Sequence, residues 1–272
     1  MAYSTGLPSL DVALGGLEGV VDIQGPPSSG KTTLCYHLLR RGGLYVPTEG
    51  GFDPTLADGL VDEDRLVIGR PRFGEAALET AAQFLPGRVV FDSASFLRPA
   101  ERQSYRFWED ATIGNRARLI AYGANVLADI CSTDGGLAVF VHQSRANIGA
   151  WFSGPIKTAY GKGTDAVATC RLRLWRKGYI RRSKRRIGIR VRVEVLANVN
   201  RPPGRVVWLD LIWGKGFRES ASMLDLCVRR RIIRKEGNWY RFDGGVLGHG
   251  RDEACSAIEG TSSLWRDLKA AL

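Results

Sequence analysis

The stretch GPPSSGKTT at residues 25–33 constrains the fold of this chain more than any other feature of its sequence. Its spacing is G-x-x-x-x-G-K-T, in which glycines and small residues let a loop close tightly so that backbone N–H groups point at an anion. An apolar run precedes the loop and a helical pattern follows it, which is the strand, loop and helix order that phosphate binding requires. The alternative is a glycine-rich turn that matches by accident.

Within this loop, Lys31 supplies a mobile positive charge for phosphate oxygens, and the Thr32 hydroxyl suits a Mg²⁺ ion. The sequence therefore predicts a nucleotide-binding protein. The residues expected to surround the nucleotide are Gly25, Pro26, Pro27, Ser28, Ser29, Gly30, Lys31, Thr32 and Thr33.

The basic charge of the chain is concentrated in one segment. Among 272 residues there are 39 lysines and arginines against 28 acids, a formal net charge of +11. Residues 171–192 hold eleven of these basic residues and no acid, which leaves 28 against 28 elsewhere. A localised excess of this kind indicates a polyanionic partner, and a solvated basic face without a ligand is the alternative.

The cysteines and the apolar runs bear on the cellular compartment. Five scattered cysteines without C-x-x-C spacing predict neither a disulfide framework nor a zinc site, and they fit a reducing cytoplasm. No signal-peptide pattern opens the chain, and no apolar run reaches the ~18 residues of a membrane span. We therefore expect a soluble intracellular protein.

Short apolar runs followed by polar or glycine-rich breaks predict a sheet. They lie at 20–23, 44–46, 89–91 and 137–141. Helical patterns alternate with them, at 75–84 and at 114–130, where the break CSTDGG (131–136) should end the helix. This alternation predicts an α/β fold with a mainly parallel central sheet flanked by helices.

After residue 165 the pattern changes to alternating basic and apolar residues, which predicts paired strands with a wet basic face. A further strand at 206–212 should close the sheet, and a final helix is expected at 263–272. We therefore divide the chain into a core, residues 1–222, and a small C-terminal α/β module, residues 223–272.

Polar side chains follow three of the predicted strands. They are Glu49 in YVPTEGG, Asp92 in RVVFDS and Gln143 in VFVHQS. Because ligands of open parallel sheets bind at the carboxyl ends of the strands, all three should face the rim that holds the phosphate loop. Asp92 suits the Mg²⁺ shell beside Thr32, and Glu49 suits orienting and deprotonating an attacking water. Either acid taken singly could instead cap a helix or begin a loop.

The twenty residues after Gln143, SRANIGAWFSGPIKTAYGKG at 144–163, predict a functional loop. They contain no acid, and three basic residues are interleaved with three aromatic ones. Phosphates need charge and unpaired bases need stacking surfaces, so this loop suits single-stranded nucleic acid. An amide that contacts the terminal phosphate at the root of the loop would couple nucleotide state to loop order. The alternative is a lid whose aromatic side chains pack on the body.

Beyond these motifs, the chain resembles the bacterial and phage RecA recombinases in order over nearly its whole length. The motifs that carry the resemblance are STGLPSLDVALGGL, GPPSSGKTTL, YVPTEGGFDP, VVFDSASFLRP, FVHQSRANIGAWFSGP and MLDLCVRRRIIRKEGNWYRFDGGVLGHG. The resemblance implies a RecA-like P-loop ATPase core with a small C-terminal module. It further implies that ATP and Mg²⁺ bind between protomers of a helical filament on single-stranded DNA, which is then paired with a homologous duplex.

The resemblance also implies residue roles. Lys31 and Thr32 would serve the phosphates and Mg²⁺, Glu49 would be the catalytic carboxylate, Asp92 the metal-side acid and Gln143 the γ-phosphate sensor. A first DNA-binding loop is implied at 101–113. The expected DNA-binding residues are Tyr105, Arg106, Phe107, Trp108, Ile113, Gly114, Arg118, Arg145, Asn147, Ile148, Gly149, Trp151, Phe152, Lys157, Gly161 and Lys162.

The chain departs from the family pattern in places. The family's N-terminal arm is absent, because the core motif begins at residue 4, and Leu56 replaces the aromatic that stacks on adenine. Ala197 and Val199 occupy the positions of two lysines that reach the γ-phosphate across the protomer boundary. Transition-state charge must then be met elsewhere, as by Arg201, or hydrolysis is slow.

The sequence thus predicts a cytoplasmic, DNA-dependent ATPase of a bacterial cell or phage-infected host that promotes homologous pairing and strand exchange. Self-association into a filament or ring is expected, and the basic hairpin at 176–186 should lie near the incoming duplex. The alternative is a RecA-like accessory protein that binds ATP and DNA without exchanging strands. A hexameric helicase motor is a third reading of the same core.

Overall fold

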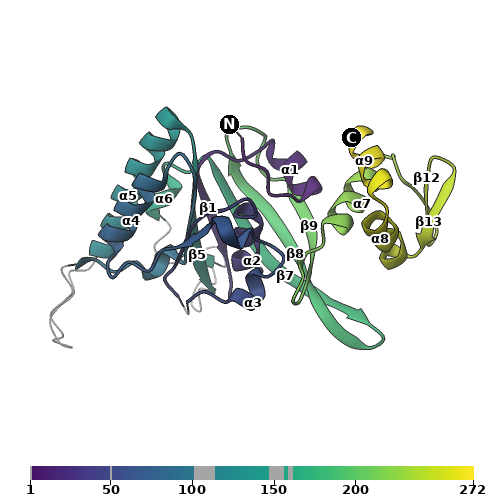
Figure 1. The fold of residues 1–272 in the computed structure, drawn as a ribbon, viewed down its shortest axis with the longest axis horizontal. Helices are drawn as coiled ribbons and strands as arrows, with labels where there is room; N and C mark the ends of the chain where they lie inside the picture. The colour runs from purple at the N-terminus through teal and green to yellow at the C-terminus, as the bar shows by residue number, and fades with distance from the viewer. Residues whose placement is uncertain (1, 50, 101–113, 147–155, 159–161) are drawn as a thin grey trace.

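The computed structural model describes residues 2–49, 51–100, 114–146, 156–158 and 162–272. A sheet of ten strands runs through the core (Figure 1), in the order β10-β9-β8-β7-β1-β5-β4-β2-β3, with β6 paired to β5. Its parallel part consists of β1 (Gly19–Gly25), β2 (Gly43–Pro47), β3 (Leu66–Ile68), β4 (Arg88–Asp92), β5 (Leu137–Ala146) and β7 (Cys170–Arg182). The mainly parallel α/β fold is confirmed.

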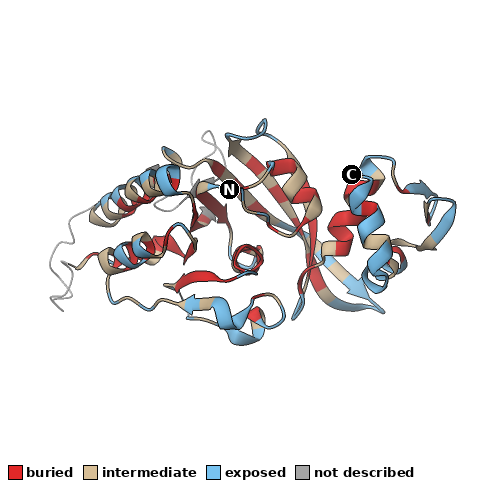
Figure 2. Ribbon diagram, turned by 45° about the horizontal axis from the view of Figure 1, so that its top comes forward, coloured by how far each residue is buried: buried red, intermediate tan, exposed pale blue. Residues whose placement is uncertain are grey.

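Helices cover both faces of this sheet. They are α1 (Pro8–Leu14), α2 (Lys31–Leu38), α3 (Pro54–Ala57), α4 (Gly74–Phe84), α5 (Asn115–Asp134) and α6 (Lys162–Asp165). On one face Ile23 of β1 packs in a cluster with Leu34 of α2, and on the other Val20 packs with Ile120 of α5. The central strands are therefore buried on both sides (Figure 2), which is why they form continuous apolar runs in the sequence.

Helix α5 and three short elements differ from the sequence prediction. Helix α5 does not end at the CSTDGG break but continues to Asp134, because Cys131 is still buried in the cluster between α5 and the sheet. The left-handed φ of 83° at Gly135 ends the helix instead. Strand β3 and the short 3-10 helices η1 (Glu63–Arg65) and η2 (Ala94–Phe96) were not predicted, since segments of three residues are too short to show a period.

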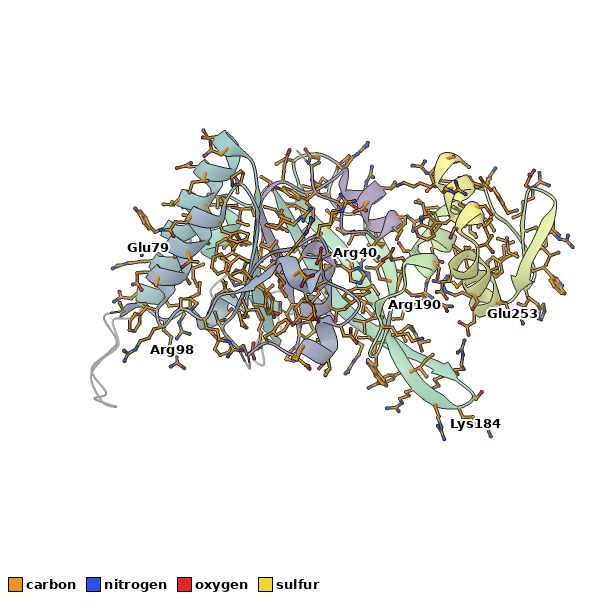
Figure 3. All side chains as sticks on the ribbon, in the orientation of Figure 1. Arg40, Glu79, Arg98, Lys184, Arg190 and Glu253 are labelled. Carbon is orange, nitrogen blue, oxygen red and sulfur yellow. The ribbon has the colours of Figure 1, made fainter. Side chains whose placement is uncertain are left out.

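The basic segment forms the longest hairpin of the described residues. Strand β7 pairs antiparallel with β8 (Arg185–Asn198), which is followed by β9 (Val206–Ile212) and β10 (Gly216–Phe217). The hairpin turn has positive φ at Ser183 and Lys184, and Lys184 marks its projecting tip in Figure 3. Near the sheet the apolar side chains are buried, whereas the arginines at the tip are exposed. The predicted alternation is confirmed, but the basic residues that alternate with the buried apolar ones are half-buried near the sheet and exposed only towards the tip.

A small C-terminal module follows the large sheet. It consists of α7 (Glu219–Arg229), the three-stranded antiparallel sheet β11 (Arg234–Glu236), β12 (Trp239–Phe242) and β13 (Gly245–His249), and helices α8 (Arg251–Gly260) and α9 (Ser262–Ala270). These elements share a hydrophobic cluster of their own, which extends from Ala221 to Leu268. Helix α7 crosses the predicted division between residues 222 and 223.

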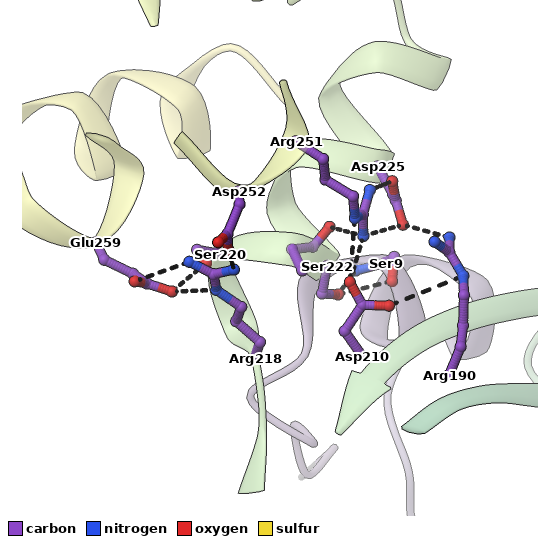
Figure 4. A network of polar contacts seen from close by, with 11 residues as sticks. Ser9, Arg190, Asp210, Arg218, Ser220, Ser222, Asp225, Arg251, Asp252 and Glu259 are labelled. Carbon is purple, nitrogen blue, oxygen red and sulfur yellow. Dashed lines mark hydrogen bonds and ion pairs between the residues drawn. The ribbon is translucent and has the colours of Figure 1, made fainter. Parts of the chain in front are cut away.

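A polar network joins this module to the large sheet (Figure 4). The Arg251 guanidinium donates to Asp210 of β9 at 3.0 Å and to Asp225 of α7 at 2.9 Å. Arg190 of β8 lies 3.8 Å and 3.5 Å from the same two carboxylates. Charged side chains from four elements, β8, β9, α7 and α8, thus hold one another in place. Within the described part of the chain, no helix is long and apolar enough to cross a membrane.

Candidate functional site: a nucleotide pocket at the carboxyl edge of the sheet

The phosphate loop connects the end of β1 to the start of α2. A side chain at Gly25 would place its Cβ 2.5 Å from the Leu174 carbonyl oxygen, and Gly30 adopts a left-handed φ of 93°, so both positions require glycine. Lys31 Nζ donates to the carbonyls of Gly25 and Pro26 at 2.9 Å each. Burial lowers the pKa of Lys31, and the nearby Asp92 carboxylate opposes that shift. The loop therefore holds a positive charge at the N-terminus of α2, where phosphate oxygens are favoured.

Asp92, at the end of β4, lies beside the phosphate loop. Its Oδ2 accepts a hydrogen bond from the Thr32 hydroxyl at 2.7 Å and one from the Tyr45 hydroxyl at 3.0 Å. Carboxylate and hydroxyl oxygens are the ligands that Mg²⁺ prefers, so Thr32 and Asp92 fit that ion. Burial and the Asp92 charge raise the pKa of Tyr45 far above its ordinary value, which keeps its hydroxyl a donor.

Tyr45 was not predicted from the sequence. Its ring is buried in β2, and only the hydroxyl reaches the site. The one available signal was a polar-tipped aromatic within an otherwise apolar strand that precedes Glu49. In the parallel pair of β2 and β4, Tyr45 is opposite Val90 and Pro47 is opposite Asp92, so Tyr45 and Asp92 lie on the same face of the sheet, two residues apart along the strands.

Glu49 and Gln143 lie at the same edge, as the parallel strands require. Gln143 of β5 is opposite Gly25 of β1, so it is in register with the start of the phosphate loop. Its side-chain amide Nε2 lies 2.6 Å from both carboxylate oxygens of Glu49. The structure thus brings a carboxylate and an amide into direct contact at the rim.

These residues surround one cavity of about 290 Å³. Its lining includes Lys31, Thr32, Glu49, Asp92 and Gln143. Asp53 and Leu56 also line it. Asp53 accepts hydrogen bonds from the Thr55 backbone N–H and hydroxyl and so caps α3. The cavity combines one ammonium group with three carboxylates, which suits a phosphate chain that carries a divalent cation.

The expected DNA-binding residues are only partly within the described chain. Gly114 precedes α5 with a left-handed φ of 103°, and Arg118 is exposed on the first turn of that helix. Arg145 of β5 is paired with Lys157 of β6 (Ile156–Thr158), and Lys162 begins α6. The others lie outside the described residues, namely Tyr105, Arg106, Phe107, Trp108, Ile113, Asn147, Ile148, Gly149, Trp151, Phe152 and Gly161.

The positions of the two family lysines lie at the end of β8. Ala197 is half-buried, and Val199 is 69% exposed just beyond the strand. Arg201 follows in the β8–β9 connection and packs on Gly15, where an added Cβ would lie 2.9 Å from its Nε. Within one chain, Arg201 is not among the residues that line the nucleotide cavity.

Comparison with known proteins extends over the whole chain. A family model described as the RecA N-terminal domain matches residues 1–218, and one described as the RecA C-terminal domain matches residues 221–272. The chain is 34% identical over 283 residues to Protein RecA of Frankia alni, which covers 98% of this chain and 82% of the relative. It is 34% identical to Protein RecA of Prochlorococcus marinus (94% and 73% covered) and 32% identical to that of Lactobacillus acidophilus (97% and 77%).

Proposed function

Because this chain belongs to the RecA family, we propose that the amide of Gln143 couples the nucleotide in the rim cavity to the grip on DNA. Membership of the family establishes the activity of the protein, whereas the roles of its residues are proposals. The protein is a DNA-dependent ATPase that uses ATP with Mg²⁺, binds single-stranded and duplex DNA, forms filaments and promotes strand exchange. The residue roles that follow are proposals from the geometry of the site.

Lys31 and the loop amides bind the phosphates, and Thr32 and Asp92 hold the cation. Mg²⁺, when bound, would neutralise charge on the phosphate oxygens. Glu49 orients the attacking water and accepts its proton, since its carboxylate faces the cavity that the phosphates occupy. The Lys31 ammonium, now held by two loop carbonyls, exchanges them for phosphate oxygens of the nucleotide.

The observation that carries the coupling proposal is the contact of Gln143 Nε2 with both oxygens of Glu49. In this arrangement the carboxylate is occupied by the amide. A terminal phosphate in the cavity offers the amide a competing anionic acceptor, and a shift of the amide to it frees Glu49 for water. The same shift moves β5 at the root of the second DNA loop, so hydrolysis competence and DNA binding change together.

Four further assignments belong to this proposal. Residues 101–113 and 144–163 contact single-stranded DNA, with Gly114 and Arg118 touching its backbone. The exposed arginines of the β7–β8 hairpin lie near the incoming duplex. The chain divides functionally into residues 1–222 and 223–272. It works in the cytoplasm of a bacterium or a phage-infected host.

Electron microscopy combined with a strand-exchange assay tests this function. The protein is mixed with circular single-stranded DNA and a non-hydrolysable ATP analogue, and exchange with a homologous linear duplex is followed with ATP. We expect continuous filaments and exchange. Discrete particles without exchange would instead establish the accessory role.

A Gln143→Asn variant tests the coupling. It keeps the amide but withdraws it by one methylene, so it should bind DNA equally with and without the analogue. An undiminished effect of the analogue on DNA binding by this variant would refute the role of Gln143 while leaving the recombinase function intact.

A further inference from the structure

A fully buried polar cluster lies immediately behind the nucleotide rim. His142 precedes Gln143 on β5, and its side chain has no solvent exposure. Its Nδ1 lies 3.4 Å from the Ser95 hydroxyl of η2, and its Nε2 lies 3.2 Å from the Thr164 hydroxyl of α6. Neutral imidazole has one donor and one acceptor nitrogen, so one ring can bond both hydroxyls at once. His142 therefore bridges two segments that are distant in the sequence.

The two partners occupy informative places. Ser95 follows the metal-side acid Asp92 by three residues. Thr164 is the first residue after the predicted DNA loop 144–163, and Gln143 is the last residue before it. In addition, Arg116 of α5, just beyond the predicted loop 101–113, donates from Nη1 to the Ser95 carbonyl at 2.9 Å. The residues that follow both predicted DNA loops, Arg116 and Thr164, thus contact the same small cluster of Ser95 and His142 behind the nucleotide pocket.

The cluster is polar, although the neighbouring part of the same face of the sheet is apolar. The same face of the sheet is apolar one step earlier, at Val20 and Phe140, which join the cluster with α5. At the next positions on this face, Asp22 and His142 are both fully buried, and Asp22 Oδ1 lies 3.9 Å from His142 Nε2. Arg171 Nε is 3.7 Å from the other Asp22 oxygen. Burying such groups costs free energy unless each is satisfied, so their presence indicates a purpose other than stability.

We propose that His142 is a positioning residue that couples the end of the second DNA loop to Gln143 through its hydrogen bond with Thr164. The inference rests on the proposed role of Gln143 and adds the mechanical connection. When bound DNA displaces α6, the hydrogen bond with Thr164 displaces the His142 imidazole. Because His142 and Gln143 are consecutive residues of β5, the position of Gln143 changes with it. The Ser95 hydroxyl holds Nδ1 of His142 at the turn after Asp92. The ring therefore rotates about its Nδ1 side when Thr164 moves.

The ratio of ATP turnover with and without single-stranded DNA measures this coupling. Thr164→Val keeps the branched shape and removes the hydroxyl, so it should lower this ratio roughly five- to tenfold, the effect of losing one hydrogen bond. Turnover without DNA should stay within about twofold of the wild type, because Thr164 does not line the nucleotide cavity. Thr164→Ser should restore the ratio.

The matched control is Thr169→Val. This change also removes a hydroxyl, which donates to the carbonyls of Glu18 and, at 2.9 Å, Val20, and neither of these partners is His142. It should lose a similar amount of stability in urea and leave the DNA stimulation ratio unchanged. Equal loss of the ratio in both valine variants would mean that general destabilisation, and not the Thr164 contact, sets the effect.

Two substitutions of His142 separate its two nitrogens. Glutamine places an amide near the position of Nε2 and keeps the Thr164 side, whereas asparagine places it near Nδ1 and keeps the Ser95 side. His142→Gln should therefore retain most of the DNA stimulation, and His142→Asn should lose as much as Thr164→Val. Adding Thr164→Val to His142→Asn should cause no further loss.

The outcomes distinguish this inference from the proposal on which it rests. If Gln143→Asn abolishes DNA stimulation while Thr164→Val and His142→Asn preserve it, the sensor stands and the His142 connection is wrong. If Gln143→Asn itself keeps the wild-type ratio, the sensor role is wrong as well.

Discussion

Replacing Tyr45 by phenylalanine tests how Asp92, for which we propose a role in holding Mg²⁺, is oriented. In the structure Asp92 Oδ2 accepts two hydrogen bonds, from Thr32 and from Tyr45. If the Thr32 hydroxyl turns to a bound cation, the Tyr45 hydroxyl becomes the remaining donor that orients the carboxylate. Tyr45→Phe removes that donor and leaves the buried ring in place, so the change isolates one hydrogen bond behind the metal site.

The expected magnitude follows from the charge of the acceptor. A hydrogen bond to a charged group contributes about 1.5–3 kcal/mol, and loss of a partner that orients a metal ligand costs about 10- to 100-fold in metal affinity. Since Tyr45 is only one of two donors to Asp92, we expect the lower end, about tenfold in the Mg²⁺ concentration for half-maximal hydrolysis, or about 1.4 kcal/mol. The rate at saturating Mg²⁺ should fall much less.

The assay is a Mg²⁺ titration of ATP hydrolysis at saturating ATP and single-stranded DNA. Tyr3→Phe is the matched control, because the Tyr3 hydroxyl also donates one hydrogen bond of 3.0 Å, to the Pro86 carbonyl, and does not line the nucleotide cavity. An unchanged Mg²⁺ dependence in Tyr45→Phe, together with a lowered stability, would show that Tyr45 supports the core and not the metal ligand.

Four further predictions concern charge. Lys31→Ala should abolish nucleotide-dependent DNA binding in a filter-binding assay, because the buried ammonium is the cavity's positive charge; unchanged binding would contradict nucleotide gating. Glu49→Gln should still bind ATP by calorimetry but hydrolyse it at least ~100-fold more slowly, as expected for a lost general base. Burial and the neighbouring Asp165 carboxylate raise the pKa of Asp22 from 3.8 to about 7 in the folded protein. The contribution of Asp22 to the free energy of unfolding is therefore complete below pH 3.8 and is lost as pH rises through 7. Urea unfolding of Asp22→Asn should lack this decline with pH. Arg251→Met removes the closer of the two guanidinium groups from Asp210 and Asp225 and leaves them only the more distant Arg190, so it should lower the free energy of unfolding by about 2–3 kcal/mol, against under ~1 kcal/mol for the exposed pair lost in Arg241→Met.

The nucleotide rim could be located from the sequence because parallel strands impose a common edge. Gly25, Asp92 and Gln143 each end or nearly end an apolar run, and in the structure these runs are neighbouring strands that point the same way. The pattern fixes the edge but not the contacts. That Gln143 donates to Glu49 depends on side-chain rotamers, which no spacing rule contains.

The features that were missed depend on pairing between distant segments. Tyr45 and His142 lie within strands where the sequence shows only an interruption of an apolar run. Their partners come from other elements, such as Asp92 for Tyr45 and Thr164 for His142, so the register of the whole sheet had to be known first. Helix α5 continues past the CSTDGG break for a related reason. Cys131 is buried against the sheet, and the local sequence does not show this tertiary contact.

The helix that begins with Lys31 is also fixed at its other end. His37 of α2 accepts a hydrogen bond from the Phe217 backbone N–H at 3.1 Å, and Arg40 pairs with Glu219 at the start of α7. The ring must be neutral to accept, and burial lowers the pKa of His37 to about 4, which keeps it so at neutral pH. A helix of eight residues therefore connects the phosphate loop to the entry of the C-terminal module. Any movement of the phosphate loop must be absorbed within α2 or passed to that module, and a hydrogen-bonded helix yields less readily than its ends.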